Sequence, residues 1–379
     1  MKVCFVSAYP PNKAYLAEYA DYLTNGLKKR NEIKEIIILA NKAKKYANLE
    51  RKGKLKIIRC WKTNSPLILF QLMKSILLVR KKIDVVHFNL NMMNWGTGKM
   101  VNFLGYLAPL LTKLFLRKKV VITLHNVVDA INLKKLKFIS PSRLTRTGLK
   151  LVTKLLLFAN KVTVTTSYYK MILEKNYNAR NVVHVPHGFL EPIKKPRLTK
   201  NVLLAFGFWD PRKKLEVLIK AFKELRKKNP KLKLVVAGTS YPRFPNYLEE
   251  VKKKFDIPGI IYTGYVPQHK VKEIFLNSTL VVLPYAVSVG SSGVLHLAAS
   301  YGKPIIMTKL PDLAEVVKEE GVMVEFTTLK DLKRTIEKLL SNVRLQRKIV
   351  KNNLKAARNL SFRVVAKEFV NLYKEVLKG

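Results

Sequence analysis

Short runs of β-branched and aliphatic residues alternate with windows of helical periodicity along most of the chain. In the first half these runs predict strands, and amphipathic windows such as 17–30 and 146–159 predict helices between them. The runs are apolar almost throughout, which is typical of parallel strands covered by helices on both faces. The strands predicted for this half are residues 2–8, 35–40, 55–60, 84–88, 119–124, 161–166 and 181–185.

A segment without periodicity interrupts the alternation at 187–201, where two prolines and several basic residues predict a linker. The alternation then resumes. Its predicted strands are 202–208, 233–238, 259–264, 279–285, 303–308 and 321–326, and its predicted helices are 213–228, 246–255, 269–276, 291–301 and 311–319. A last amphipathic helix is predicted for 361–377.

This pattern predicts an α/β protein of two Rossmann-like, doubly wound domains that face a cleft. Ligands of such sheets bind outside the carboxyl ends of the strands, so the cleft is the expected binding region. The expected boundaries are 1–190 for the first domain, 191–200 for the linker, 201–360 for the second domain and 361–379 for the closing helix.

The charge of the chain changes this picture, because 72 Lys and Arg stand against 25 Asp and Glu, a formal net charge of +47. Two interpretations stay open. The surface attracts phosphates or an anionic membrane, or it is a lysine-rich solvated surface of the kind found in thermophiles. No aromatic–basic interleaving typical of a nucleic-acid module is present, so no nucleic-acid partner is expected.

Two apolar segments with basic ends, 66–82 and 103–119, are candidates for contact with a membrane. Lysine interrupts both before they reach the roughly 20 apolar residues that a membrane span needs. They are interpreted as core helices or, alternatively, as helices that lie on a membrane surface.

The cysteines, the histidines and the first residues of the chain lead to three further expectations, about disulfides, metal sites and localisation. Cys4 and Cys60 are the two cysteines, which excludes a disulfide framework. The six histidines lack the spacing of metal ligands, so no metal site is predicted. No signal-peptide pattern follows Met1, so a cytoplasmic protein is expected, peripheral at the inner membrane face if it meets a membrane.

A corner of very small residues, Gly290-Ser291-Ser292-Gly293, connects the strand predicted at 279–285 to the helix at 291–301. A helix N-terminus offers unpaired N–H groups to an anion, and small residues let a phosphate approach them. An ordinary serine N-cap with a glycine turn is the simpler alternative. Neither a G-x-G-x-x-G motif nor a Walker lysine motif is present.

With these features the sequence resembles GT-B glycosyltransferases of the large retaining family 4. The strand, glycine-containing loop, helix and "GKP" of residues 281–308 follow one another as they do in that family. Further similar segments are 9–23 "YPPNKAYLAEYADYL", 120–127 "VVITLHNV", 183–189 "VHVPHGF", 205–225 "AFGFWDPRKKLEVLIKAFKEL", 262–285 and 361–373. The resemblance implies that the last helix crosses back to the N-terminal domain.

Only some of the site residues typical of this family are present at the matching positions of this sequence. Lys213 matches the lysine of the donor-phosphate segment, whereas Phe208 stands in place of its arginine and the adjacent Arg212 could substitute. Val289 and Leu297 occupy the positions of the two glutamates that the family usually has. Tyr15 occupies the position of a glycine in the first loop.

The resemblance implies a hexosyltransferase that moves a sugar, with retention, from a nucleotide-diphosphate donor to a lipid-linked, glycan or other acceptor. No metal or other cofactor is expected, and an anionic membrane or a polyprenyl-linked acceptor is a candidate partner. The candidate residues are Lys213, His125 and Arg212 for catalysis, Gly290, Ser291, Ser292, Gly293 and Val294 for the donor phosphates, and Asn126 and Tyr15 for the sugar or acceptor. The departures leave open an alternative, a degenerate GT-B protein that binds nucleotide, glycan or a partner without turnover.

Overall fold

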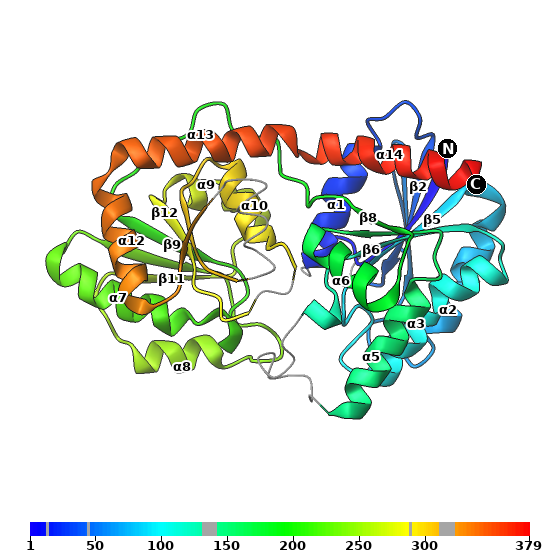
Figure 1. Ribbon diagram of the computed structural model, residues 1–379, viewed down its shortest axis with the longest axis horizontal. Helices are drawn as coiled ribbons and strands as arrows, with labels where there is room; N and C mark the ends of the chain where they lie inside the picture. The colour runs from blue at the N-terminus through cyan, green and yellow to red at the C-terminus, as the bar shows by residue number, and fades with distance from the viewer. Residues whose placement is uncertain (13–14, 44–45, 131–141, 288–289, 311–322) are drawn as a thin grey trace. The chain divides into compact units, whose positions relative to one another are not determined.

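The computed structural model describes the chain except for residues 13–14, 44–45, 131–141, 288–289 and 311–322 (Figure 1). The described residues form two compact units, each with its own sheet. Unit 1 contains the described residues up to Gly188 together with Phe362–Gly379, and unit 2 contains those of Phe189–Ser361. The closing helix therefore belongs to the same unit as the N-terminal half of the chain.

Unit 1 is built on an eight-stranded sheet in the order β3-β4-β2-β1-β5-β6-β7-β8. All neighbouring strands run parallel except β3, which is antiparallel to β4. The strands are β1 (Lys2–Val6), β2 (Glu35–Asn41), β3 (Leu49–Lys52), β4 (Leu55–Trp61), β5 (Val85–Leu90), β6 (Lys119–Leu124), β7 (Lys161–Val164) and β8 (Val182–His184).

Helices cover both faces of this sheet, and alternate residues of each strand meet opposite layers. Cys4 and Val6 pack with α2, α3, α5 and α6 in one core cluster. Phe5 points the other way, to His87, whose imidazole hydrogen-bonds the Tyr373 hydroxyl of α14 at 2.6 Å. The helices are α1 (Tyr15–Leu27), α2 (Ile68–Val79), η1 (Arg80–Lys82), α3 (Lys99–Leu114), η2 (Val128–Ala130), α5 (Arg143–Leu156), α6 (Ser167–Tyr177) and α14 (Phe362–Lys378).

Unit 2 is built on a parallel six-stranded sheet in the order β11-β10-β9-β12-β13-β14. Leu203 and Leu234 pack toward α7, α8 and α12, while Leu204 and Val281 pack toward α9, α10 and α13. The strands are β9 (Val202–Phe206), β10 (Lys233–Ala237), β11 (Ile260–Gly264), β12 (Leu280–Leu283), β13 (Ile305–Thr308) and β14 (Met323–Phe326). The helices are η3 (Pro211–Lys213), α7 (Leu215–Lys228), α8 (Tyr247–Lys254), α9 (Gln268–Leu276), α10 (Gly293–Ser300), α12 (Leu329–Ser341) and α13 (Val343–Asn359).

The segment 191–200 is fastened to the body of unit 2 by a buried lysine. The Lys303 ammonium donates hydrogen bonds to the carbonyl oxygens of Arg197, Leu276 and Ser278 at 2.6, 2.9 and 2.8 Å. Burial lowers the pKa of Lys303 to about 8. The lysine of the "GKP" sequence thus joins three separate segments of the unit through their backbones.

The predicted fold class is confirmed, because two α/β units with parallel sheets are present. Each predicted strand is found, with ends that differ by a few residues. The sequence interpretation missed β3, which pairs with β4 across a tight turn at Gly53 (φ +60°), and it missed α12 and α13. The helix predicted at 311–319 and Val289 lie outside the described residues. Among the described residues, no helix has the length and apolar character that a membrane span requires.

Candidate functional site

The carboxyl edge of the sheet in unit 1 carries a buried polar network. Asn89 of β5 donates to the Ser7 hydroxyl, which follows β1, at 2.9 Å. The Asn89 side-chain oxygen accepts a hydrogen bond of 2.6 Å from Nε2 of His125, which follows β6. The network therefore joins the ends of three neighbouring strands. Sequence analysis singled out His125 but missed Ser7 and Asn89, whose shared position at strand ends was the available signal.

His125 is buried, and the Tyr19 ring lies edge-on to its imidazole with centroids 4.4 Å apart. Burial lowers the pKa of His125 to about 3, so the imidazole is neutral near pH 7. Asn126, the next residue, accepts a hydrogen bond from the Met92 backbone N–H at 2.8 Å. Tyr15 begins α1, and its side chain is outside the described part.

Two loops meet at the carboxyl edge of the sheet in unit 2, because β9 and β12 are neighbours there. One loop follows Phe206 and contains η3, and the other follows Leu283 and leads into α10. The Ala286 N–H donates to the Arg212 carbonyl at 2.7 Å, which fastens the two loops together. This edge brings Lys213 close to Val294 and to Tyr285, and so to the small-residue corner at 290–293.

Gly207 gives Lys213 room to lie across the end of β9. Gly207 has φ +128°, and a Cβ built on it would be 2.7 Å from the Lys213 ammonium and 3.6 Å from Val294 Cγ2. Any side chain at this position would displace the ammonium. The lysine therefore reaches back over the glycine toward the first turn of α10.

The Lys213 ammonium has aromatic neighbours but no carboxylate partner among the described residues. It lies 5.6 Å from the ring centroid of Trp209 and 5.2 Å from that of Tyr285. Its pKa is lowered to about 8, chiefly by burial; the nearby Asp210 carboxylate acts to raise the pKa and the Arg212 cation acts to lower it. A half-buried cation held by ring faces keeps its charge available for an anion that enters the site.

Arg212, the neighbouring catalytic candidate, is paired within the protein. The buried Asp210 carboxylate accepts hydrogen bonds from the Arg212 amide at 2.8 Å and from its guanidinium at 2.9 and 2.6 Å. The same guanidinium lies 5.6 Å from the Tyr241 ring. The structure thus assigns Arg212 to neutralising Asp210 and leaves Lys213 as the cation without a carboxylate at this corner.

The corner at 290–293 combines unusual backbone angles with unsatisfied polar groups. Gly290 has φ +101° and Ser292 has φ +55°, a left-handed value that costs a residue with a side chain some stability. Ser291 is buried, and its hydroxyl has no hydrogen-bond partner among the described residues. Within the same part of the chain, the N–H groups of Ser291, Ser292 and Gly293 find no acceptor. Unpaired donors at the start of a helix form a seat for an anion.

Neighbouring side chains hold the corner in this shape. Tyr285, whose pKa is raised by burial, lies beside the Ser292 side chain. His296 donates from Nδ1 to the Ser292 carbonyl at 2.9 Å, and its ring packs on Phe189 with centroids 4.5 Å apart. Leu297, at one of the two glutamate positions, packs against the apolar cluster beside α10. The sequence analysis missed Trp209 and Tyr285, which lie in the loops that follow β9 and β12 at this edge.

Residues 189–356, nearly all of unit 2, match the family "Glycosyl transferases group 1". Unit 2 is a group 1 glycosyltransferase domain. An uncharacterized glycosyltransferase of Methanocaldococcus jannaschii is 24% identical over 58% of this chain, and the aligned part spans 60% of that relative's length.

Solved structures show that the chain has the GT-B fold. Sucrose-phosphate synthase from Thermosynechococcus elongatus superimposes with a TM-score of 0.77 at 15% identity, over 100% of this chain and 99% of that one. The Anabaena protein HepE in complex with UDP and glucose has a TM-score of 0.72 at 13% identity, over 99% of each chain. HepE in complex with UDP-glucose has a TM-score of 0.73 at 14% identity, over 99% of this chain and 100% of that one.

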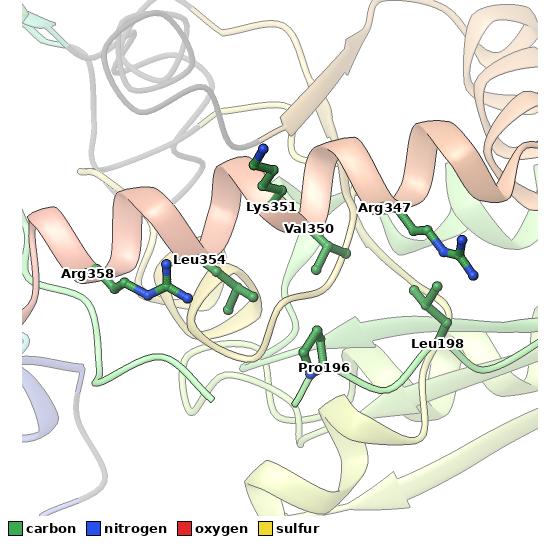
Figure 2. Close-up of a pocket in the computed structure, with 7 residues that line it drawn as sticks. All are labelled: Pro196, Leu198, Arg347, Val350, Lys351, Leu354 and Arg358. Carbon is green, nitrogen blue, oxygen red and sulfur yellow. The ribbon is translucent and has the colours of Figure 1, made fainter. Parts of the chain in front are cut away.

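The group 1 domain also carries an open groove that does not involve the predicted site residues. The groove has a volume of about 540 Å³ and lies between the segment 191–200 and α13 (Figure 2). Its lining residues are Pro196, Leu198, Arg347, Val350, Lys351, Leu354 and Arg358. Gly302 (φ +60°) lies beneath it, where a Cβ would be 3.0 Å from Pro196. The groove is thus a basic rim over a small apolar floor, separate from the small-residue corner.

Proposed function

We propose that the protein transfers a sugar from a nucleotide-diphosphate donor to a lipid-linked, glycan or other acceptor, with retention of the anomeric configuration. One observation carries this proposal: the Lys213 ammonium, which lacks a carboxylate partner among the described residues, lies at the edge where Ser291, Ser292 and Gly293 present unpaired donors. The match to group 1 glycosyltransferases supports it, as do the structures of the similarly folded HepE in complex with UDP and glucose and with UDP-glucose.

In the proposed reaction the bond between the anomeric carbon and the donor's phosphate oxygen breaks, and the acceptor hydroxyl oxygen forms the new bond. The acceptor proton ends on the departing diphosphate or in solvent. Negative charge grows on the leaving phosphate as the bond breaks, so fixed donors aimed at it lower the barrier. Lys213 supplies the charge, and the corner from Gly290 to Val294 supplies N–H and hydroxyl donors.

The remaining candidates have supporting roles in the proposal. Arg212 keeps Asp210 neutralised, so that this carboxylate does not compete with the phosphates for Lys213. His125, with a pKa of about 3, acts as a neutral hydrogen-bonding group toward the sugar and not as a base near pH 7. Asn126 and Tyr15 are proposed sugar or acceptor contacts.

A thermal-shift screen with UDP-, GDP-, ADP- and dTDP-sugars tests donor binding, and turnover of the best donor then tests transfer. We expect one nucleotide class to raise the melting temperature and Lys213→Ala to lower turnover by about 100-fold or more. Lys220→Ala, which removes an exposed lysine of α7, is the matched control. Because protein groups supply the positive charge, EDTA should leave turnover unchanged.

A catalytically degenerate protein is the second candidate function, and Leu297 favours it. A leucine that packs into the apolar cluster offers no carboxylate to a ribose or a sugar. Tight binding of a nucleotide sugar without hydrolysis or transfer would support this candidate over the enzyme. Binding of no nucleotide sugar in the panel would contradict the donor site itself.

A further inference from the structure

The helical layer formed by α2, α3 and α5 in unit 1 exposes many large apolar side chains. In the described residues, nine of the seventeen exposed large hydrophobic side chains lie on this layer or directly beside it. They are Leu67, Phe70, Leu77, Leu78, Met100, Leu114, Phe115, Leu151 and Phe158. We call this surface the α2–α3–α5 face. The three helices lie side by side over one face of the sheet (Figure 1).

The helix α2 shows that these side chains do not serve the core. Its inner side, Ile68, Leu72 and Ile76, is fully buried against the sheet. Its opposite side carries Phe70 and Leu78, which are 63% and 73% exposed. A surface helix normally turns polar residues outward, so a second apolar side needs a partner outside the unit.

The charge of the α2–α3–α5 face is uniform in sign. Segments 62–82, 99–118 and 143–160 together contain thirteen Lys and Arg and no Asp or Glu. None of these cations forms an ion pair with a carboxylate in the described part of the chain. The Lys74 ammonium instead lies 6.0 Å from the Phe70 ring centroid, and Lys113 donates to the Phe158 carbonyl. Cations and apolar side chains are therefore interleaved on one surface.

We infer that the α2–α3–α5 face docks on an anionic lipid bilayer, with Phe70, Leu78 and Phe115 entering the boundary between headgroups and acyl chains. Interleaved cations attract anionic headgroups, and long lysine side chains extend their charge to the headgroup level while their stems cover apolar surface. A protein partner would have to be both acidic and apolar over three helices, whereas an anionic bilayer offers both properties everywhere. If the proposed function holds, docking brings the group 1 domain to a lipid-linked acceptor. The docking itself does not depend on turnover.

The helix α13 provides an internal comparison. Arg344, Arg347, Lys348, Lys351, Lys355 and Arg358 are exposed on it, and it contains no acidic residue. The exposed large hydrophobic side chains near it are Leu198 of the groove in Figure 2 and Val343. This surface is strongly basic, like the α2–α3–α5 face as a whole, but it lacks the exposed aromatic and leucine side chains of that face. If charge alone determined lipid binding, α13 and the α2–α3–α5 face would both bind anionic lipid. The inference instead predicts that binding depends on the α2–α3–α5 face, which has both charge and exposed apolar side chains.

Co-sedimentation with phosphatidylglycerol-containing and pure phosphatidylcholine vesicles tests the inference. We expect the full chain to bind the anionic vesicles and to bind the neutral ones at least about tenfold more weakly. Replacing Lys74, Lys81 and Lys150 by Ala should weaken binding about tenfold or more, and so should replacing Phe70, Leu78 and Phe115 by Ser. The matched control replaces Lys348, Lys351 and Lys355 of α13 by Ala, and its binding should change less than about twofold.

A fluorescence measurement gives a second readout that does not depend on the stability of a triple variant. A Leu78→Cys variant labelled with an environment-sensitive dye should shift its emission to the blue on anionic vesicles. The same label at Ile261, an exposed residue of β11 in unit 2, should not shift. The native Cys4 is buried, and burial raises the pKa of the half-buried Cys60 thiol to about 11, so both should react slowly with the dye.

Four results would overturn the inference. They are no binding to anionic vesicles, equal loss of binding in the α13 control, unchanged binding after the Phe70, Leu78 and Phe115 replacements, and binding to RNA in preference to vesicles. Donor turnover with a water-soluble acceptor, measured in the same variants, separates the two proposals. Intact turnover with lost vesicle binding is expected, whereas lost turnover in Lys213→Ala with intact vesicle binding would concern the proposed function alone.

Discussion

The carboxyl edge of each sheet carries a basic side chain whose pKa is lowered by burial. His125 in unit 1 is neutral near pH 7, whereas Lys213 in unit 2, with a pKa of about 8, is still mostly charged. In unit 1, His125 is buried and donates a hydrogen bond from its Nε2–H to the side-chain oxygen of Asn89. In unit 2, Lys213 is half-buried beside Trp209 and Tyr285, and no carboxylate of the described residues pairs with it. Under the proposed function, Lys213 in unit 2 is the group that meets negative charge, whereas His125 in unit 1 is a neutral hydrogen-bonding group.

The largest expected effect follows from removing the Lys213 ammonium. Lys213→Ala should lower kcat/KM by about 100-fold to 1,000-fold, the usual cost of losing a donor to a transition-state anion. Steady-state kinetics with the donor found in the thermal-shift screen measures the change, with Lys220→Ala as the control. Activity within about twofold of the wild type would remove Lys213 from the proposed mechanism.

A pH series sharpens the comparison, because the two edges should titrate differently. The ammonium loses its proton as the pH rises through about 8, so the Kd of the nucleoside diphosphate should rise by up to about tenfold per pH unit above that value. Calorimetric titration between about pH 7 and pH 10 follows this change. Lys213→Arg, whose side chain stays charged, should abolish the inflection near pH 8, and an unchanged inflection in that variant would assign it to another group.

Unit 1 should instead respond to acid. The unfolded chain protonates His87 and His125 near their ordinary pKa of about 6.5, whereas burial lowers the pKa of each to about 3 in the folded protein. Between these values the unfolded state binds more protons. The free energy of unfolding should therefore fall by up to about 1.4 kcal/mol per pH unit for each imidazole as the pH drops below about 6.5.

Urea unfolding across this range measures the slope. His125→Asn should reduce the slope by about half of the histidine contribution, whereas His269→Asn, at an exposed position of α9, should leave it unchanged. Equal slopes in the wild type and in His125→Asn would show that His125 does not contribute to acid sensitivity.

The smallest effect is expected at Ser291. Its buried hydroxyl has no partner among the described residues, so Ser291→Ala should leave the free energy of unfolding unchanged or slightly raised. Donor affinity should nevertheless fall about threefold to tenfold, the usual value of one hydrogen bond to a ligand. Ser300→Ala, which removes a buried hydroxyl that donates to the His296 carbonyl, is the contrasting variant. Ser300→Ala should lose stability and keep its donor affinity. If Ser291→Ala lost stability and kept its donor affinity instead, Ser291 would not be part of the proposed anion site.

Sequence reasoning predicted most of the fold, because buried parallel strands leave long apolar runs that few other structures produce. It missed β3, a short exposed edge strand in which Lys and Arg interrupt the apolar pattern, since edge strands need no continuous apolar face. It also missed α13, whose many Lys, Arg and Asn residues obscure the apolar positions that it buries.

The candidate site was predictable in part. The corner at 290–293 and Lys213 could be proposed as candidates from the sequence, because each is recognised within one short segment: a run of small residues before a helix, and a lysine that matches the donor-phosphate segment of a known family. The Asn89–His125 hydrogen bond and the rings of Trp209 and Tyr285 could not, because they depend on which strand ends are neighbours in the folded sheet. The pairing of Arg212 with Asp210, two residues away, was visible in principle, since an aspartate that caps a short helical turn can reach the next arginine.

A crystal structure with the nucleotide found in the thermal-shift screen tests the central claim most directly. The account predicts that the diphosphate accepts hydrogen bonds from the Lys213 ammonium and from the N–H groups of Ser291, Ser292 and Gly293. A diphosphate bound at another position in the protein, with Lys213 and the small-residue corner untouched, would contradict the account.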